Sequence, residues 1–138
     1  MEDIKALIPH REPFLFVDEI AAADEDGIIG WKTFEDSFFV FSGQIPERKI
    51  VPEVLLIESM AQCGGAGAKK LNLLSEEGLM VLTMIEKARF FSNVEPGNLV
   101  TMKIKTLKVR NKGVKQYGTA HCNGKLVAEA TWWCMKLK

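Results

Sequence analysis

The chain has 138 residues, 47% of them hydrophobic and 26% charged, a composition typical of a soluble globular protein with one sizeable core. Its 18 basic and 18 acidic residues balance, which argues against nucleic acid or an anionic membrane as partners. Three cysteines without CxxC spacing predict neither a disulfide framework nor a zinc site. No leader follows Met1 and no apolar run could span a bilayer, so we expect a cytoplasmic protein without a membrane anchor.

The first third of the chain predicts a short helical turn and one β-hairpin. Apolar residues at 4–8 have helical spacing, but Pro9 limits this segment to one or two turns. Residues 14–22 and 28–34 are then predicted to be two strands joined by a turn at 24–27.

A long buried helix is predicted from Pro52 to about Leu71. The proline suits a first helical position, and Glu53 beside it complements the helix dipole. Apolar side chains cover nearly every direction of this helix, so we expect it to form the centre of the core. Three glycines within 64–67 lower helix propensity. They indicate either a close approach by another backbone or an early end to the helix.

The remainder of the chain predicts strands separated by turns. The Asn123-Gly124 pair is a strong hairpin signal, because both residues tolerate the positive φ of a type I′ turn. One helix with antiparallel hairpins before and after it predicts an α+β fold, and no linker or repeat divides 1–138, so we expect one domain. The predicted strands are 79–91, 99–109, 114–122 and 125–137.

Glu58 is the candidate catalytic residue, because it is an ionisable group on a helix that is otherwise almost entirely apolar. A buried carboxylate is costly unless it is paired, and one that is kept is a candidate general acid or base. The alternative interpretation is a carboxylate that reaches solvent at the helix edge or pairs with an arginine.

The loop before the helix, at 40–46, is a second candidate part of a site. It is apolar, contains Gly43 and the amide of Gln44, and leads into the helix start. Free backbone N–H groups at a helix N-terminus can stabilise a developing oxyanion, such as that of a thioester carbonyl.

Four segments of the chain resemble the FabZ-type (3R)-hydroxyacyl-acyl-carrier-protein dehydratases, in the same order and with similar spacing. The resemblance implies a hot-dog fold, in which a curved antiparallel sheet wraps one long helix. The segments are LIPHREPFLFVDEI at 7–20, GQIPERKIVPEVLLIESMAQ at 43–62, IEKARFFSNVEPGNLV at 85–100 and GTAHCNGKLVAEA at 118–130.

The resemblance also implies a homodimer, with each site at the interface between two protomers. Its catalytic pair is a histidine before the helix and a carboxylate fourteen positions later, and these positions are Gln44 and Glu58 here. An amide cannot act as the base that a dehydratase needs. A second departure is Glu53, where the family has a glycine whose amide donates to the thioester oxygen, and the added charge opposes an oxyanion.

We therefore assign Glu58 and Gln44 as the catalytic positions, with no cofactor and no metal. His10 and His121 are weaker candidates to replace the missing histidine, since the family carries His10 outside its catalytic pair and His121 adjoins the last hairpin turn. Cys63 has no visible base and is interpreted as core filling. The residues predicted to contact substrate are Phe41, Gly43, Ile45, Glu53 and Val54.

Three functions remain open, and all take an acyl chain on acyl carrier protein or coenzyme A as the ligand. The first is a divergent dehydratase of fatty-acid or related acyl-chain biosynthesis, in which Glu58 does most of the acid and base work. The second is a hot-dog thioester hydrolase that uses Glu58 and Gln44. The third is a binding subunit without turnover of its own, which completes a site in a mixed dimer or a larger oligomer with a related protein.

Overall fold

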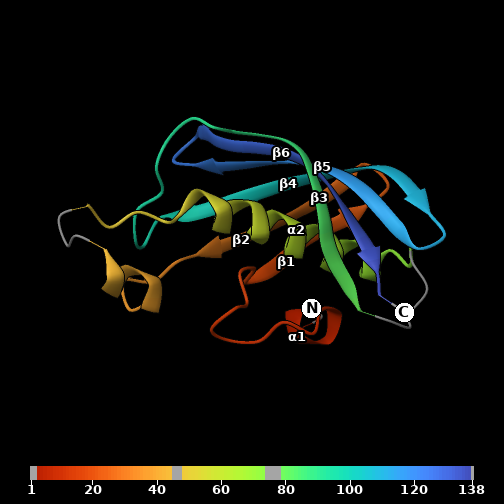
Figure 1. Cartoon of the computed structure of the whole chain (residues 1–138), viewed down its shortest axis with the longest axis horizontal. Coiled ribbons are helices and arrows are strands. Elements are labelled where there is room, and N and C mark those ends of the chain that lie inside the picture. Colours follow the sequence, from red (N-terminus) through yellow and green to blue (C-terminus); the bar gives the residue numbers. More distant parts are fainter. Residues whose placement is uncertain (1–2, 45–47, 74–78, 138) are drawn as a thin grey trace.

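The computed structural model describes residues 3–44, 48–73 and 79–137. Six strands form one antiparallel sheet that curves around a single long helix, α2 (Glu53–Lys70), as Figure 1 shows. The order across the sheet is β1-β2-β4-β5-β6-β3, so β1 and β3 are its edges. This arrangement confirms the predicted α+β hot-dog fold. The strands are β1 (Glu19–Asp24), β2 (Gly27–Thr33), β3 (Met80–Phe90), β4 (Leu99–Arg110), β5 (Gly113–Cys122) and β6 (Lys125–Lys136).

Two short helical segments lie outside the sheet. The four-residue helix α1 (Ile4–Leu7) begins after Asp3, whose side chain accepts a hydrogen bond from the Lys5 N–H. The 3-10 helix η1 (Phe39–Gly43) belongs to the long connection between β2 and α2, which extends to the left in Figure 1.

The helix α2 forms the centre of the core. Pro52 is its N-cap, so the helix begins one residue later than predicted, and Lys70 ends it. The side chains of Met60, Cys63 and Ala66 are fully buried against the sheet. A helix this thoroughly covered is stabilised mainly by the apolar surface that it buries.

Two of the three α2 glycines face the sheet closely. A Cβ on Gly64 would overlap the Gln116 side chain of β5, and a Cβ on Gly67 would lie 2.5 Å from side-chain carbons of Ile28 on β2. At Gly65, no atom of the described residues would lie within 4 Å of an added Cβ. The helix continues through all three glycines, so close packing explains two of them and the alternative of an early helix end is wrong.

The predicted strand at 14–22 is wrong in its first half, because β1 begins only at Glu19. Residues 14–18 do not form a strand, although the Asp18 N–H donates to the Trp31 carbonyl of β2. The Phe16 N–H and the Phe14 carbonyl instead bond the side chain of Gln62 on α2. These backbone groups are therefore satisfied by the helix rather than by a neighbouring strand.

The remaining predicted elements agree with the structure to within one or two residues. The Asn123-Gly124 hairpin is confirmed, since the two residues have φ of 52° and 77° and join β5 to β6. Within the three described ranges, no helix is both long and apolar enough to cross a membrane.

The glycine packing predicts opposite effects for two neighbouring substitutions. Gly67→Ala should lower the free energy of unfolding by about 1–3 kcal/mol, because the new methyl overpacks against the β-branched Ile28. Gly65→Ala should raise it by up to about 1 kcal/mol, since alanine favours the helix and meets open space. Urea denaturation of both variants tests this, and equal effects would contradict the close approach.

Candidate active site

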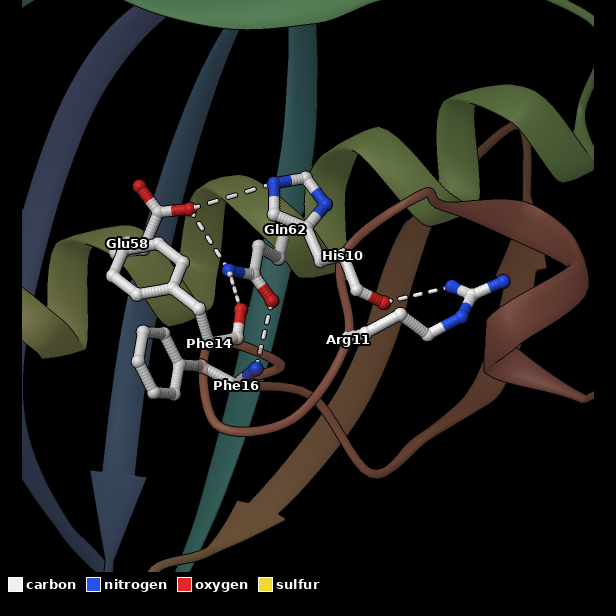
Figure 2. Close-up of polar contacts among 6 residues, drawn as sticks. All are labelled: His10, Arg11, Phe14, Phe16, Glu58 and Gln62. Carbon is white, nitrogen blue, oxygen red and sulfur yellow. Dashed lines mark hydrogen bonds and ion pairs between the residues drawn. The ribbon is translucent and has the colours of Figure 1, made fainter. Parts of the chain in front are cut away.

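Glu58 lies on the face of α2 that is turned toward the N-terminal segment. Its side chain is 21% exposed, so it is mostly covered but reachable from solvent. Oε2 accepts a hydrogen bond of 2.9 Å from Nε2 of Gln62, one helical turn further along α2, as Figure 2 shows. The alternative of an arginine partner is not seen: within the described ranges, the nearest basic group to Glu58 is His10.

The Gln62 amide has a fixed orientation. Its Oε1 accepts from the Phe16 N–H at 2.7 Å, so its Nε2 faces the other way and donates both to the Phe14 carbonyl at 3.1 Å and to Glu58. The side chain is only 3% exposed. Because a backbone N–H must meet the amide oxygen, the amide nitrogen is held against the carboxylate.

His10 is the third member of the cluster. Its Nε2 lies 3.9 Å from Oε2 of Glu58, and its side chain is 28% exposed. Its Nδ1 is buried and has no hydrogen-bond partner among the described residues. The guanidinium of Arg11 bonds the carbonyls of Lys5, Ile8 and His10, which fixes the loop that carries the imidazole.

A cavity of about 120 Å³ opens beside these three side chains. Apart from Glu58, Gln62, His10 and Lys69, its lining is almost entirely apolar or small. The remaining lining residues are Leu7, Ile8, Pro9, Ala61, Gly65, Leu79, Met80, Leu82 and Cys134.

Burial disfavours the thiolate form of Cys134 in this cavity. Burial raises the pKa of its thiol to about 12, and the negative charge of Glu58 acts in the same direction. The same holds for Cys63, whose thiol pKa is raised to about 12 by burial alone. A cysteine needs its thiolate form to act as a nucleophile, so both are packing residues near neutral pH.

Gln44 is engaged with the backbone of its own loop. Its Nε2 donates to the Ile50 carbonyl at 2.9 Å, and its Oε1 accepts from the Ile50 N–H at 3.0 Å. These two bonds close the connection between η1 and α2. Gln44 is not among the residues that line the Glu58 cavity in this chain.

The other predicted contact residues that the structure describes do not line the Glu58 cavity within one chain. Phe41 is 1% exposed and packs edge-on against Phe38 with ring centroids 5.6 Å apart. Gly43 is exposed, as are Glu53 and Val54 at the start of α2, and Ile45 lies outside the described residues. The resemblance placed these residues at an interface between two protomers, so their contact with substrate stays a prediction.

His121 lies on β5 and is separate from this cavity. Its Nε2 is 3.0 Å from the Thr119 hydroxyl, and burial, followed by the charge of Lys103, lowers its pKa. In the described part of the chain, no group of three or more His, Cys, Asp or Glu side chains could hold a metal ion.

Sequence reasoning found Glu58 but did not assign Gln62 to the site and ranked His10 low. Gln62 carries a visible signal, since it is the other long polar side chain one helical turn from Glu58 on an apolar helix. His10 is far from Glu58 in the sequence. Only the path of the N-terminal segment across α2 brings the two together.

Comparison with known proteins supports the fold and shows the family. The family model described as "FabA-like domain" matches residues 8–131. A solved structure described as "The Dehydratase Heterocomplex ApeI:P from Xenorhabdus doucetiae" has a TM-score of 0.84 at 15% identity and covers 100% of this chain and 93% of that one. A hypothetical thioesterase with coenzyme A from Streptococcus pneumoniae TIGR4 has a TM-score of 0.65 at 12% identity, covering 86% and 84%.

The chain thus belongs to the FabA-like domain family, a class of hot-dog proteins. Within it, the chain is similar to curated proteins named 3-hydroxyacyl-[acyl-carrier-protein] dehydratase FabZ. The one from Solibacter usitatus is 36% identical over 136 residues, or 97% of this chain and 83% of that protein. The one from Thermotoga petrophila is 37% identical over 127 residues, or 92% and 90%.

The Gln62 network predicts a large stability effect from a substitution of nearly equal volume. Gln62→Leu should lower the free energy of unfolding by about 1–3 kcal/mol, because it leaves the buried Phe16 N–H without an acceptor.

Ser59→Ala is the matched control on the same helix, since the buried Ser59 hydroxyl has no hydrogen-bond partner among the described residues. This substitution should leave the free energy of unfolding unchanged or raise it. Chemical denaturation compares the two, and a Gln62→Leu protein as stable as wild type would contradict the network.

Proposed function

We propose that the protein is a 3-hydroxyacyl-acyl-carrier-protein dehydratase, a lyase of fatty-acid or related acyl-chain biosynthesis, in which Glu58 carries the proton transfers. The observation that carries the proposal is the placement of the Glu58 carboxylate at an apolar cavity, held by Gln62 and beside His10. The names of the curated relatives support the reaction and the carrier.

The chemistry requires one proton to leave carbon and one to reach oxygen. Removing water from a 3-hydroxyacyl thioester takes a proton from C2 and releases the 3-hydroxyl as water. A single carboxylate can do both in sequence, by taking the C2 proton and returning it to the departing oxygen. Gln62 binds Oε2 of Glu58, while Oε1 has no partner among the described residues and is available for this transfer.

Gln44 does not supply a second base. Its amide cannot take a proton from carbon, and both ends of the amide bond the Ile50 backbone. Losing a general base typically slows a reaction by about 10²- to 10⁴-fold, so we expect slow dehydration relative to histidine-containing relatives. The same two bonds weigh against a thioesterase in which Gln44 would orient a water molecule.

The cavity fits the reacting end of an acyl chain rather than a whole substrate. At about 120 Å³ it is smaller than the roughly 300–1,000 Å³ of a typical ligand pocket. Its apolar lining suits the hydrocarbon portion. The remainder of the substrate site would be completed by a second protomer, as the resemblance implies.

A homodimer is part of the proposal. β3 is a sheet edge, and its Met84 and Ile85 side chains are 54% and 46% exposed. A long edge strand with exposed apolar residues is suited to pairing with another strand. Two copies joined along β3 would cover both the open strand edge and the exposed apolar side chains. A related subunit joined in the same way would give the mixed dimer.

A turnover assay tests the proposal. Purified protein is incubated with 3-hydroxyacyl and trans-2-enoyl thioesters of acyl carrier protein and of coenzyme A, and the products are identified by mass spectrometry. The wild type should interconvert the two acyl forms, and Glu58→Gln should lower kcat at least about 10²-fold, because an amide cannot carry the proton. Gln44→Ala should keep most of the activity.

Three results would contradict the proposal. Release of free acid that is lost in Gln44→Ala would indicate a thioesterase. A silent wild type that becomes active as Gln44→His would indicate a pocket without a working base. A wild type active only when mixed with a histidine-bearing relative would indicate a subunit of a mixed dimer.

A further inference from the structure

His10 and Glu58 flank the same cavity and come from the same chain. The 3.9 Å between Nε2 of His10 and Oε2 of Glu58 is too long for a direct hydrogen bond. It is the separation that one oxygen atom can bridge, because a point about 2.8 Å from both atoms exists between them. A substrate hydroxyl placed there would contact both side chains at once.

The surroundings of the imidazole favour one arrangement of its proton. Nδ1 is buried with no hydrogen-bond partner among the described residues, so it is unsatisfied in either tautomer and the choice depends on Nε2. A hydrogen on Nε2 points to the cavity and the Glu58 carboxylate, whereas a lone pair there would face the negative charge. The neutral ring with its hydrogen on Nε2 therefore gives a donor at the site.

We propose that His10 is a further catalytic residue, whose Nε2–H donates to the departing 3-hydroxyl oxygen and completes the Glu58 site within one protomer. This inference rests on the proposed function and names the group that assists Glu58. It also gives a reason why a chain with Gln44 keeps a workable site.

The reaction step is balanced without any additional reactant. Glu58 takes the C2 proton, the C2–H electron pair forms the C2–C3 double bond, and the C3–O bond breaks with its electrons on oxygen. Glu58 then returns the proton to that oxygen, which leaves as water. His10 keeps its own proton throughout, and its hydrogen bond stabilises the negative charge that develops on the oxygen.

The loop that carries His10 is held on both sides, which such a donor requires. Before the imidazole, the Arg11 guanidinium bonds the Lys5 and Ile8 carbonyls, and after it Gln62 bonds Phe14 and Phe16. Figure 2 shows the His10 ring turned toward Glu58 from this loop while Arg11 points away. A donor fixed before the reaction needs little reorganisation during it.

Isosteric variants test the role of the ring. His10→Gln places an amide N–H near the position of Nε2, whereas His10→Leu has no donor. We expect His10→Leu to lower kcat about 10²- to 10³-fold, the usual loss for one such donor, with a smaller change in KM. His10→Gln should recover at least about tenfold of that loss. His121→Gln, on β5 away from the cavity, is the matched control and should match the wild type.

Equal activity of His10→Leu and wild type, with Glu58→Gln inactive, would overturn the role of His10 and leave the proposed function standing. Equal losses in His10→Gln and His10→Leu would also overturn it, because the amide should replace the donor. Thermal unfolding of both variants separates a catalytic loss from a folding defect, since a structural role alone would lower Tm and kcat together.

A second measurement does not depend on turnover. The chain has two histidines, so ¹⁵N NMR of the ring nitrogens, with His121→Gln for assignment, reports the tautomer of His10 directly. We expect the hydrogen on Nε2 and a change in its signal in Glu58→Gln. In the turnover assay described above, by contrast, a wild type that converts none of the thioesters would overturn the proposed function. A hydrogen on Nδ1, with a signal unchanged in Glu58→Gln, would overturn the pairing itself.

Discussion

The side-chain amide of Gln62 joins the central helix to the N-terminal segment. It lies in the middle of α2, is almost fully buried, and bonds the Phe16 N–H, the Phe14 carbonyl and the Glu58 carboxylate. Two of these partners are backbone groups that would otherwise need a neighbouring strand. The Gln62 amide thus has two roles. It anchors the segment that carries His10, and it orients the Glu58 carboxylate that faces the cavity.

The position of the candidate site follows from this anchoring. Because Phe14 and Phe16 bond the helix, β1 begins only at Glu19, and the segment before it packs against α2. His10 thereby comes within 3.9 Å of Glu58. The loop with Gln44 is closed separately by Ile50, so its amide serves the loop and lies outside the Glu58 cavity in this chain.

Periodicity and turn chemistry predicted most of the fold because those signals are local. The buried helix, the Asn123-Gly124 hairpin and the four later strands each depend on neighbours within a few residues. The strand at 14–22 failed for the opposite reason, since its backbone partners are on a helix far along the chain. The alternation of residues along that segment carries no information about Gln62.

The residues of the candidate site also differ in whether the sequence alone reveals them. Glu58 is visible in the sequence because a carboxylate on an apolar helix is unusual, and the resemblance supports it independently. Gln62 is visible as an amide one helical turn away. The short distance between His10 and Glu58 depends on the tertiary structure and cannot be predicted from residue spacing. The residues expected from a second protomer, Gln44 and Phe41 among them, depend on an interface that a single chain does not contain.

A crystal structure of the protein with a 3-hydroxyacyl-pantetheine analogue, in which an amide replaces the thioester, would test the shared role of Glu58 and His10 most directly. We expect the 3-hydroxyl oxygen to lie between the Glu58 carboxylate and Nε2 of His10 of the same protomer, with C2 facing Oε1 of Glu58. A 3-hydroxyl bound beside Gln44, or an acyl chain bound elsewhere, would contradict this shared role.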